Sequence, residues 1–576
     1  MSLIRNAAIF LVGLTLFSCV DNFAVEDNPS SGPTVELNEH NNIVEDTYFT
    51  DYVDLTTYAG DDFYEYAVGK WLEEHPLKSR ERMNGTFPEL MALCEKFIDE
   101  LYKKTDQDEI IKRLQDDLAH STMEEDAKLV KQKLAAVDAI TTKEAMYQKM
   151  GDLLLEGYQM PGALSGIVVN RKFYAALDFY DYDSEYEIQD ETLEEFLDEA
   201  DCKKAREIVA DYAKILVDNE MVSGSEIEIP RHLRQEHFVF IHPARHRAAG
   251  SSSPLMQILA RAGLSETDLT MVADKGYTAV GNFIANLSVD DLKLFVKFMI
   301  VHRERTYYDA ELSKSDAGGM GKLAIDKFSP MHLRFSALFN KLIPDGNQQA
   351  AIQVAENVRD AFRERIKKLT WMTDETKAKA IEKLDAMIFY IGWPVGDSKR
   401  KDWEVQLPAA NADGKHSFYT DVCDLYKQQV QIVLKKAKSG NLDASDLFYG
   451  IELTSPSYVA NAYNYPENNA IFVLSSQLMP PMFDASRSVF LNYGILGAGT
   501  IGHEITHGFD TTGKLYDKTG VKTEWMAAAE GEAFDADPLS VHIRKALQVI
   551  GPGDKVPCLA FSETAVDAVE PLPALV

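Results

Sequence analysis

Apolar residues recur at helical spacing along most of the chain. This helical spacing runs from Asp61 to about Phe448, and the segment from Gln349 to Leu369 shows it most clearly. Thr373 is placed to cap a second helix that runs to about Met387, and the sequence Gly392-Trp393-Pro394 ends this helical stretch. The pattern therefore predicts a mainly α-helical protein.

The pattern changes after Val459. Residues Ala470 to Leu474 form a short run rich in β-branched and aromatic residues, which predicts a strand, and Pro480-Pro481 follows it. The segment from Val489 to Asp510 is apolar and rich in small residues, which predicts a buried helix. No repeat of about 20–50 residues is visible, so the sequence gives no support for a solenoid. We expect a small sheet within a helical fold.

The amino-terminal segment 1–19 differs from the rest of the chain. Arg5 precedes an apolar run from Ala7 to Phe17, which is shorter than the about 20 apolar residues that span a bilayer and is typical of a signal peptide. The sequence Leu16-Phe17-Ser18-Cys19 resembles the end of a bacterial lipoprotein signal, in which the cysteine carries the lipid. We predict a lipoprotein-type signal peptide, with a plain secretory signal or a buried amino-terminal helix as alternatives.

Residues 20–48 are polar and show little periodicity, which predicts a flexible tether. Together with the signal, they predict an exported protein. We expect it to be anchored in a membrane through a lipid on Cys19 and to face the periplasm or the cell surface.

Composition narrows the range of partners. The chain has 576 residues and 45% hydrophobic content, which is enough for two or more domains. Its 59 Lys and Arg against 91 Asp and Glu give a net charge of -32, so we expect no nucleic acid partner. Four later cysteines form no Cys-x-x-Cys pair; they are Cys94, Cys202, Cys423 and Cys558. We expect free thiols, and the alternative in an exported protein is two disulfides, with three possible pairings.

The sequence His503-Glu504-Ile505-Thr506-His507 carries the candidate chemistry. Residues four apart on a helix lie one turn above each other, so His503 and His507 can share one ion. Zinc accepts neutral imidazole nitrogens and keeps a position for water in catalytic sites, where Glu504 would act as the general base. Such polar side chains are costly in an apolar helix unless they are paired or bind a metal. We predict one Zn²⁺ per chain.

Two histidines leave zinc one protein ligand short. Glu563 is the best candidate for that ligand, and Asp567 follows four residues later, on the same helical face. We predict that Asp567 orients the ring of His503 and that Asp510 orients the ring of His507. The alternative is that Glu563 and Asp567 are two surface acids.

The sequence from Gly497 to Gly502 formally matches the dinucleotide-binding pattern Gly-x-Gly-x-x-Gly. A Rossmann fold needs a strand directly before the glycines and a βαβ frame around them, and the helical sequence upstream supplies neither. We therefore attribute these small residues to close packing of the metal-binding helix.

At these residues the chain resembles the neprilysin and endothelin-converting-enzyme family of zinc endopeptidases, and we expect a bacterial member. The similar segments lie within roughly residues 50–525 and are more specific together than a lone zinc motif. They are Asp62 to Trp71, Trp371 to Pro394, Asn461 to Tyr463 with the following Asn469 to Pro481, and Ile501 to Asp510.

The resemblance implies a mainly α, two-domain fold. A thermolysin-like zincin catalytic domain with a small sheet is expected at 49–85 and 425–576, and a large helical lid domain around a central chamber at 86–424. The resemblance also implies that Asn461 and Ala462 hold the substrate backbone as an added strand. The function that it implies is a zinc-dependent endopeptidase, which we expect to be a monomer, acting on short peptides with an apolar residue after the cleaved bond.

Three features depart from the family pattern. The sequence from Ser562 to Asp567 stands where the family has Gly-Glu-Asn-x-x-Asp, and the resemblance stops at Met526 apart from this pair of acids. The chain also ends at Val576, before the region that supplies a histidine and an arginine in relatives. The alternatives to an active peptidase are an inactive truncated or frameshifted family member and a non-catalytic peptide-binding lipoprotein.

Overall fold

The fold is seen in a computed structural model. It describes residues 53–54, 56–58, 60–77, 85–101, 108–120, 123–169, 171–178, 191–218, 253–264, 274–308, 323, 329–370, 372–394, 399–409, 416–439, 443–510, 512–526 and 530. The chain divides into two compact units. Unit 1 comprises the described residues of Met1–Glu95, Phe339–Pro394 and Ser457–Val576, and unit 2 those of Lys96–Leu338 and Val395–Pro456.

Unit 1 contains the candidate motif. Its helices are α3 (Phe63–Glu74), α15 (Asn347–Lys368), α16 (Asp374–Ala386), α19 (Val489–Asn492) and α20 (His503–His507), with a π-helical segment, η6 (Tyr493–Gly502). Its strands are β3 (Ile388–Ile391), β4 (Ala462–Tyr465) and β5 (Ala470–Val473), and its 3-10 turns are η4 (Pro466–Asn468), η5 (Ser475–Leu478) and η7 (Gly513–Leu515).

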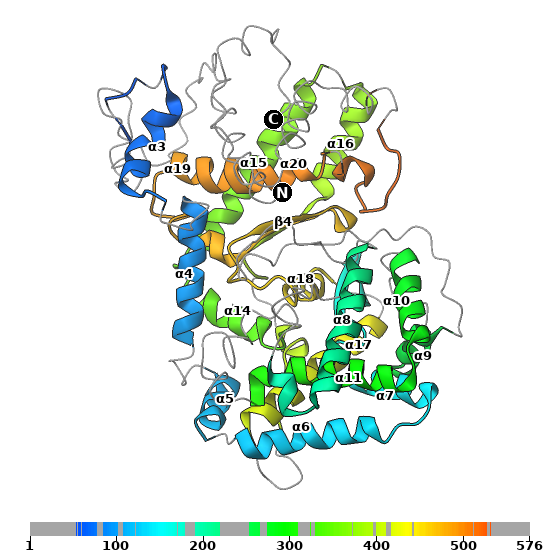
Figure 1. Cartoon of the computed structure of the whole chain (residues 1–576). Coiled ribbons are helices and arrows are strands. Elements are labelled where there is room, and N and C mark those ends of the chain that lie inside the picture. Colours follow the sequence, from blue (N-terminus) through cyan, green and yellow to red (C-terminus); the bar gives the residue numbers. More distant parts are fainter. Residues whose placement is uncertain are drawn as a thin grey trace. The chain divides into compact units, whose positions relative to one another are not determined.

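The two helices predicted with most detail are confirmed. Helix α15 covers the periodic segment and ends with the basic side chains of Arg365, Lys367 and Lys368, which suit the negative end of a helix dipole. Helix α16 begins after Thr373, whose side chain accepts a hydrogen bond from the backbone N–H of Thr376. Helices α15 and α16 pack against each other (Figure 1).

The predicted strand is confirmed as β5, the central strand of a three-stranded sheet with the order β3-β5-β4. Strand β3 runs parallel to β5, and β4 runs antiparallel with Ala462 opposite Val473. All four residues of β5 are buried, as expected for a strand with a neighbour on each side. Among the described residues, β4 is therefore an edge strand.

The predicted helix from Val489 to Asp510 is helical but not uniform. It passes from α19 through the wider π-helical turns of η6 into α20. Glycines favour such a departure, because they have low α-helical propensity, and Gly497 packs closely against α15. A Cβ atom at Gly497 would lie 3.3 Å from Val354 and 3.4 Å from Val358. Close packing is thus confirmed, and a strand-to-helix turn at these glycines is not found.

Unit 2 is mostly helical. It contains α5 (Glu109–His120), α6 (Met123–Asp138), α7 (Lys143–Leu155), α8 (Glu199–Asp218), α9 (Pro254–Arg261), α10 (Asp274–Asn286), α11 (Val289–Tyr308), α17 (Phe418–Ser439) and α18 (Ala444–Glu452). The 3-10 turns η1 (Glu191–Glu195) and η3 (Lys399–Asp402) also lie here, while α4 (Thr86–Leu101) and α14 (His332–Asn340) run across the limits of the units. Helix α11 packs against α6, α7, α8 and α17, which explains why it is apolar on several faces.

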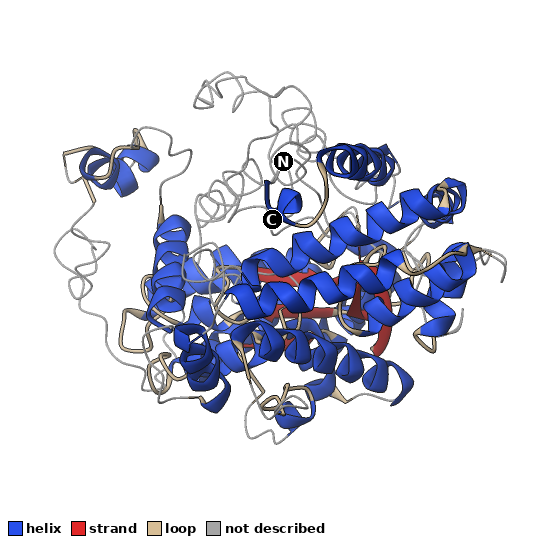
Figure 2. Ribbon diagram, turned by 60° about the horizontal axis from the view of Figure 1, so that its bottom comes forward, coloured by secondary structure: helices blue, strands red, loops and turns tan. Residues whose placement is uncertain are grey.

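Unit 2 also contains a hairpin that the helical prediction missed. Strands β1 (Ala163–Val169) and β2 (Lys172–Asp178) pair antiparallel, with Val169 opposite Lys172. Figure 2 shows the strands in red among the blue helices. The sequence held a signal for β2, because Phe173, Ala175 and Leu177 alternate with other residues and are all buried.

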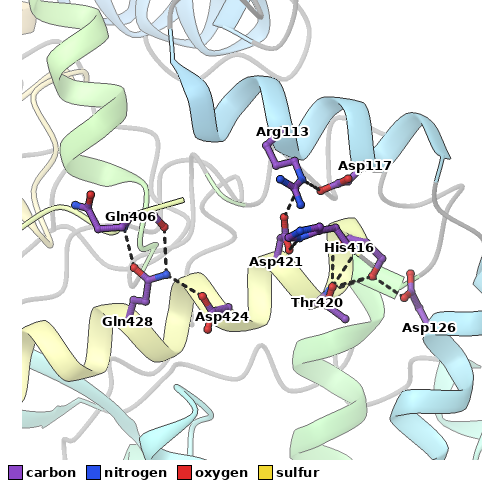
Figure 3. Close-up of polar contacts among 10 residues, drawn as sticks. Arg113, Asp117, Asp126, Gln406, His416, Thr420, Asp421, Asp424 and Gln428 are labelled. Carbon is purple, nitrogen blue, oxygen red and sulfur yellow. Dashed lines mark hydrogen bonds and ion pairs between the residues drawn. The ribbon is translucent and has the colours of Figure 1, made fainter. Parts of the chain in front are cut away.

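A polar cluster surrounds the first turn of α17. Figure 3 shows Arg113 and His416 directed toward Asp421, and Asp126 directed toward the same end of the helix. His416 Nδ1 lies 3.0 Å from Asp421 Oδ1, and the Ser417 hydroxyl donates to Asp126 Oδ1 at 2.8 Å. Burial raises the pKa of both Asp126 and Asp421 to about 6.

The predicted domain limits remain a prediction. Residues 339–394 fall in unit 1 with the candidate motif, whereas the predicted lid domain includes them. Cys94, Cys202 and Cys423 are free, while Cys19, Cys558 and the segments 1–19 and 20–48 lie outside the described residues. Within the described part of the chain, no helix is both long and apolar enough to cross a membrane.

Candidate functional site

The two motif histidines converge on one point. His503 and His507 lie one turn apart on α20, and their Nε2 atoms are 2.9 Å apart. Two imidazole nitrogens bound to tetrahedral zinc at about 2.0–2.1 Å would be about 3.3 Å apart. A shift of a few tenths of an ångström therefore separates this arrangement from a pair of zinc ligands.

Asp510 fixes the ring of His507. Its Oδ2 lies 2.8 Å from His507 Nδ1, so a carboxylate there accepts the Nδ1 proton and leaves the Nε2 lone pair directed at the shared point. Burial raises the pKa of the Asp510 carboxyl, but hydrogen bonds from His507 and from the Gly513 and Thr512 amides outweigh it and hold the pKa below its usual value. Asp510 thus makes the contact that its predicted orienting role requires.

The two histidines fit a cation that binds imidazole nitrogen, but they supply only two of the protein ligands that it needs. No third His, Cys, Asp or Glu among the described residues completes a metal-binding group with the two histidines. Glu563 and Asp567, the predicted third ligand and its orienting neighbour, lie outside the described residues. The metal-ligand assignments of all these residues therefore stay predictions.

Strand β4 holds the motif helix from one side. Glu504 lies between the two histidines in sequence and is buried, at 6% exposure. The Asn464 side-chain amide donates a hydrogen bond of 2.6 Å to the backbone carbonyl of Glu504. The edge strand and the predicted base are therefore joined directly, by an interaction that the sequence did not predict.

Asn461 and Ala462 lie at the beginning of the same strand. Ala462 is the first residue of β4, and its N–H donates to the side-chain oxygen of Asn461 at 2.8 Å. A peptide that pairs with this N–H has to displace the Asn461 side chain. The structure brings the two predicted substrate-binding residues to the edge strand that contacts α20.

Gly513 lets the chain after the motif pass close to α20. A Cβ atom at Gly513 would lie 1.9 Å from the carbonyl oxygen of His507 and 2.5 Å from the carbonyl carbon of Gly508. The Gly513 N–H donates to Asp510 Oδ1 at 2.7 Å. A side chain at this position is incompatible with the approach that brings Asp510 beneath His507.

Lys383 of α16 supports the same loop. Its side chain is buried, at 1% exposure, and Nζ donates to the carbonyl of Gly508 at 2.6 Å. Local sequence patterns did not single out this residue, although a signal existed. Lys383 lies seven residues after Thr376, on the helix face that also carries the buried Ala380 and Leu384.

The comparisons with known proteins agree on one family. Sequence profiles described as peptidase family M13 match residues 255–394 and 461–543. The second match contains the motif helix, β4 and β5. It extends beyond Met526, so the expectation that family resemblance stops at that residue is wrong.

Relatives with similar sequences carry names from the expected family. Neprilysin-11 of Caenorhabditis elegans is 33% identical over 193 residues, which cover 33% of this chain and 22% of that protein. The match spans about a quarter of the length of the neprilysins of Caenorhabditis elegans and Trittame loki.

Solved structures share the fold at low sequence identity. The zinc metalloprotease Zmp1 of Mycobacterium tuberculosis, solved with an inhibitor, is 20% identical with a TM-score of 0.56, and the match covers 84% of this chain and 78% of that one. PepO from Lactobacillus rhamnosis is 17% identical with a TM-score of 0.58, covering 83% and 80%. The mainly helical fold with a small sheet is therefore confirmed. These matches confirm the expected resemblance to peptidase family M13, the neprilysin and endothelin-converting-enzyme family, over the matched residues.

Proposed function

We propose that this chain is a zinc-dependent endopeptidase that hydrolyses short peptides. The observation that supports this most directly is the convergence of the two Nε2 atoms, 2.9 Å apart, on a helix that contacts an edge strand. Similarity to curated proteins named neprilysins and endothelin-converting enzymes supports the same reaction.

His503 and His507 are proposed to hold a single Zn²⁺ through Nε2, with Glu563 as the third protein ligand. When bound, zinc polarises a carbonyl group and lowers the pKa of water. Asp510 keeps the Nδ1 proton on His507, so that this ring binds through Nε2 alone. Asp567 is proposed to do the same for His503.

Glu504 is proposed to be the general base. It is buried beside the two histidines, and the hydrogen bond from Asn464 fixes its backbone. A carboxylate in this position removes a proton from the attacking water and can pass it to the leaving amine. Asn461 and Ala462 are proposed to bind the substrate backbone along β4, in the manner of an added strand.

The finer properties belong to the same proposal. We propose a preference for an apolar residue after the cleaved bond and a monomeric protein. We also propose export and membrane attachment through a lipid on Cys19, because segment 1–19 has the pattern of a lipoprotein signal.

The proposal is tested with the full chain and a set of fluorogenic peptides. Glu504→Gln keeps the shape of the side chain but removes the base, so turnover should fall by about 10²–10⁴-fold while zinc affinity stays near that of the wild type. Glu375→Gln makes the same change at an exposed position, 79% accessible, and should leave both quantities unchanged.

Turnover that survives Glu504→Gln would refute the assigned role. Zinc binding that depends on His503 but gives no turnover with any peptide would favour an inactive family member. Peptide affinity that persists in Glu504→Gln, in a chain that never cleaves, would instead favour a peptide-binding protein.

A further inference from the structure

Lys383 places a buried positive charge beneath the loop that follows the motif helix. Its Nζ donates to the carbonyl oxygens of Gly508, Gly513 and Tyr516 at 2.6, 2.7 and 2.7 Å. An ammonium group has three hydrogens, so these acceptors use all of them. A neutral amine, with two N–H bonds, could not satisfy the same three carbonyls.

Two aromatic rings and two carboxylates also lie near this ammonium group. The rings of Phe509 and Trp525 lie 5.4 and 5.7 Å from Nζ. Burial lowers the pKa of Lys383 to about 7, and the negative charges of Asp510 and Asp517 oppose the shift. An apolar side chain of similar length would avoid the cost of burying a charge. The presence of a lysine here therefore points to a role for its contacts with the three carbonyls.

The three carbonyls belong to the stretch of chain that follows α20, and the orienting carboxylate of Asp510 lies in the same stretch. Gly508 directly follows the motif helix, whose last carbonyls have no helical partner, and a cation is favoured at that end. Gly513 is held on both sides, because its carbonyl accepts from Lys383 while its N–H donates to Asp510 Oδ1. Asp510 Oδ2 in turn accepts a hydrogen bond from the Nδ1–H of His507.

These contacts form a continuous path from α16 to the metal-binding nitrogen. We propose that Lys383 is a positioning residue of the metal site, which fixes the segments 508–510 and 512–516 so that Asp510 stays against His507. This inference rests on the proposed zinc site but assigns a role outside the motif. Lys383 touches neither substrate nor metal, and it acts through Gly513 and Asp510.

The first test is zinc affinity of the full chain, measured by competition with a chromophoric chelator. Lys383→Met keeps most of the side-chain volume and removes the donors, so affinity should fall by about 10–100-fold, as for other residues that orient metal ligands. The control is Lys379→Met, on the same helix but 45% exposed, which should bind zinc within about twofold of wild type.

A double-mutant cycle separates positioning from general support of the fold. If Lys383 acts through Asp510, then Lys383→Met added to Asp510→Asn should weaken zinc binding by much less than it does in the wild type. Equal losses in both backgrounds would overturn the proposal. Unchanged zinc affinity in Lys383→Met would also overturn it.

Chemical rescue provides a third readout and a safeguard. Lys383→Ala removes the outer three carbons and the nitrogen, which n-propylammonium can replace. Added n-propylammonium should recover part of the lost zinc affinity, and n-propanol should not. Rescue by neither compound would count against a role for the charge. Loss of the fold in both Lys383→Met and Lys383→Ala, even with zinc, would assign Lys383 to folding alone. Wild-type chain that shows no His503-dependent zinc binding would instead refute the proposed function itself.

Discussion

Replacement of Gly513 by alanine tests whether the loop after α20 really determines the geometry of the metal site. The new Cβ would lie 1.9 Å from the His507 carbonyl oxygen, and Cβ contacts below 3.0 Å are essentially never seen. The loop and the helix end must therefore separate by about 1 Å. The obstacle is backbone on both sides, so no flexible side chain can move aside to relieve it.

The size of the effect follows from the contacts that this shift breaks. The Gly513 N–H donates to Asp510 and its carbonyl accepts from Lys383, each at 2.7 Å. Lengthening either bond by about 1 Å takes it beyond hydrogen-bonding distance. We expect Gly513→Ala to lower the free energy of unfolding by about 1–3 kcal/mol, the usual range for overpacking. Zinc affinity should fall by about 10–100-fold, because Asp510 loses its support.

Urea unfolding of the zinc-free chain and chelator competition measure the two effects separately. Gly494→Ala is the matched control, because it lies in the π-helical segment before the motif and a Cβ there meets nothing within 4 Å. Its unfolding free energy should stay within about 1 kcal/mol of wild type. If Gly513→Ala unfolds at the wild-type urea concentration and binds zinc equally well, the loop does not set the geometry of the site.

Three further changes test other parts of the structure. Asn464→Ala removes the 2.6 Å hydrogen bond to the Glu504 carbonyl and should lower kcat about fivefold with little change in KM, measured with a peptide substrate; an effect on KM alone would contradict this. The pKa of Asp126 is raised to about 6 from 3.8, so its contribution to stability is present below pH 3.8 and is lost as the pH rises through 6. In urea titrations, the unfolding free energy of Asp126→Asn should therefore gain up to about 3 kcal/mol relative to wild type between pH 4 and pH 7. A difference between the two proteins that stays constant with pH would refute the assignment. Asp446→Ala leaves the buried Lys436 ammonium, 3.0 Å away, without its carboxylate and should cost about 3 kcal/mol in unfolding free energy, and a loss below 1 kcal/mol would show that the pair is dispensable.

Local sequence patterns predicted the elements whose signals were long and repeated. Helices α15 and α16 follow from apolar periodicity and from the Thr373 cap, and β5 follows from a β-rich run that is buried on both faces. The β1–β2 hairpin was missed because the prediction described the region from Asp61 to Phe448 by its dominant period. The two-residue alternation in β2 covers only a few positions and was hidden within that longer pattern.

The motif itself was predicted, but its supports were not. His503 and His507 are identifiable because their spacing alone determines that they share a helix face. Gly513 looks like an ordinary turn residue in sequence, and Lys383 resembles the neighbouring half-buried Lys377 and exposed Lys379 of α16. What distinguishes them is contact with the segment after α20, more than a hundred residues from Lys383 in the chain. Such information is tertiary and leaves little trace in local composition.

The supports matter because α20 is too short to hold its own geometry. The helix has five residues and follows a π-helical segment rich in glycine, and isolated helices below about 12 residues are marginal in water. Three separate elements compensate: α15 packs against η6, β4 bonds to Glu504 through Asn464, and α16 holds the loop through Lys383. The two histidines are therefore held in position to share an ion only because α15, β4 and α16 support this part of the chain. A copy of the motif in another helix would have the same spacing, but its imidazole rings would not be held in the same orientation. The supporting contacts, and not the motif alone, are therefore the features to test.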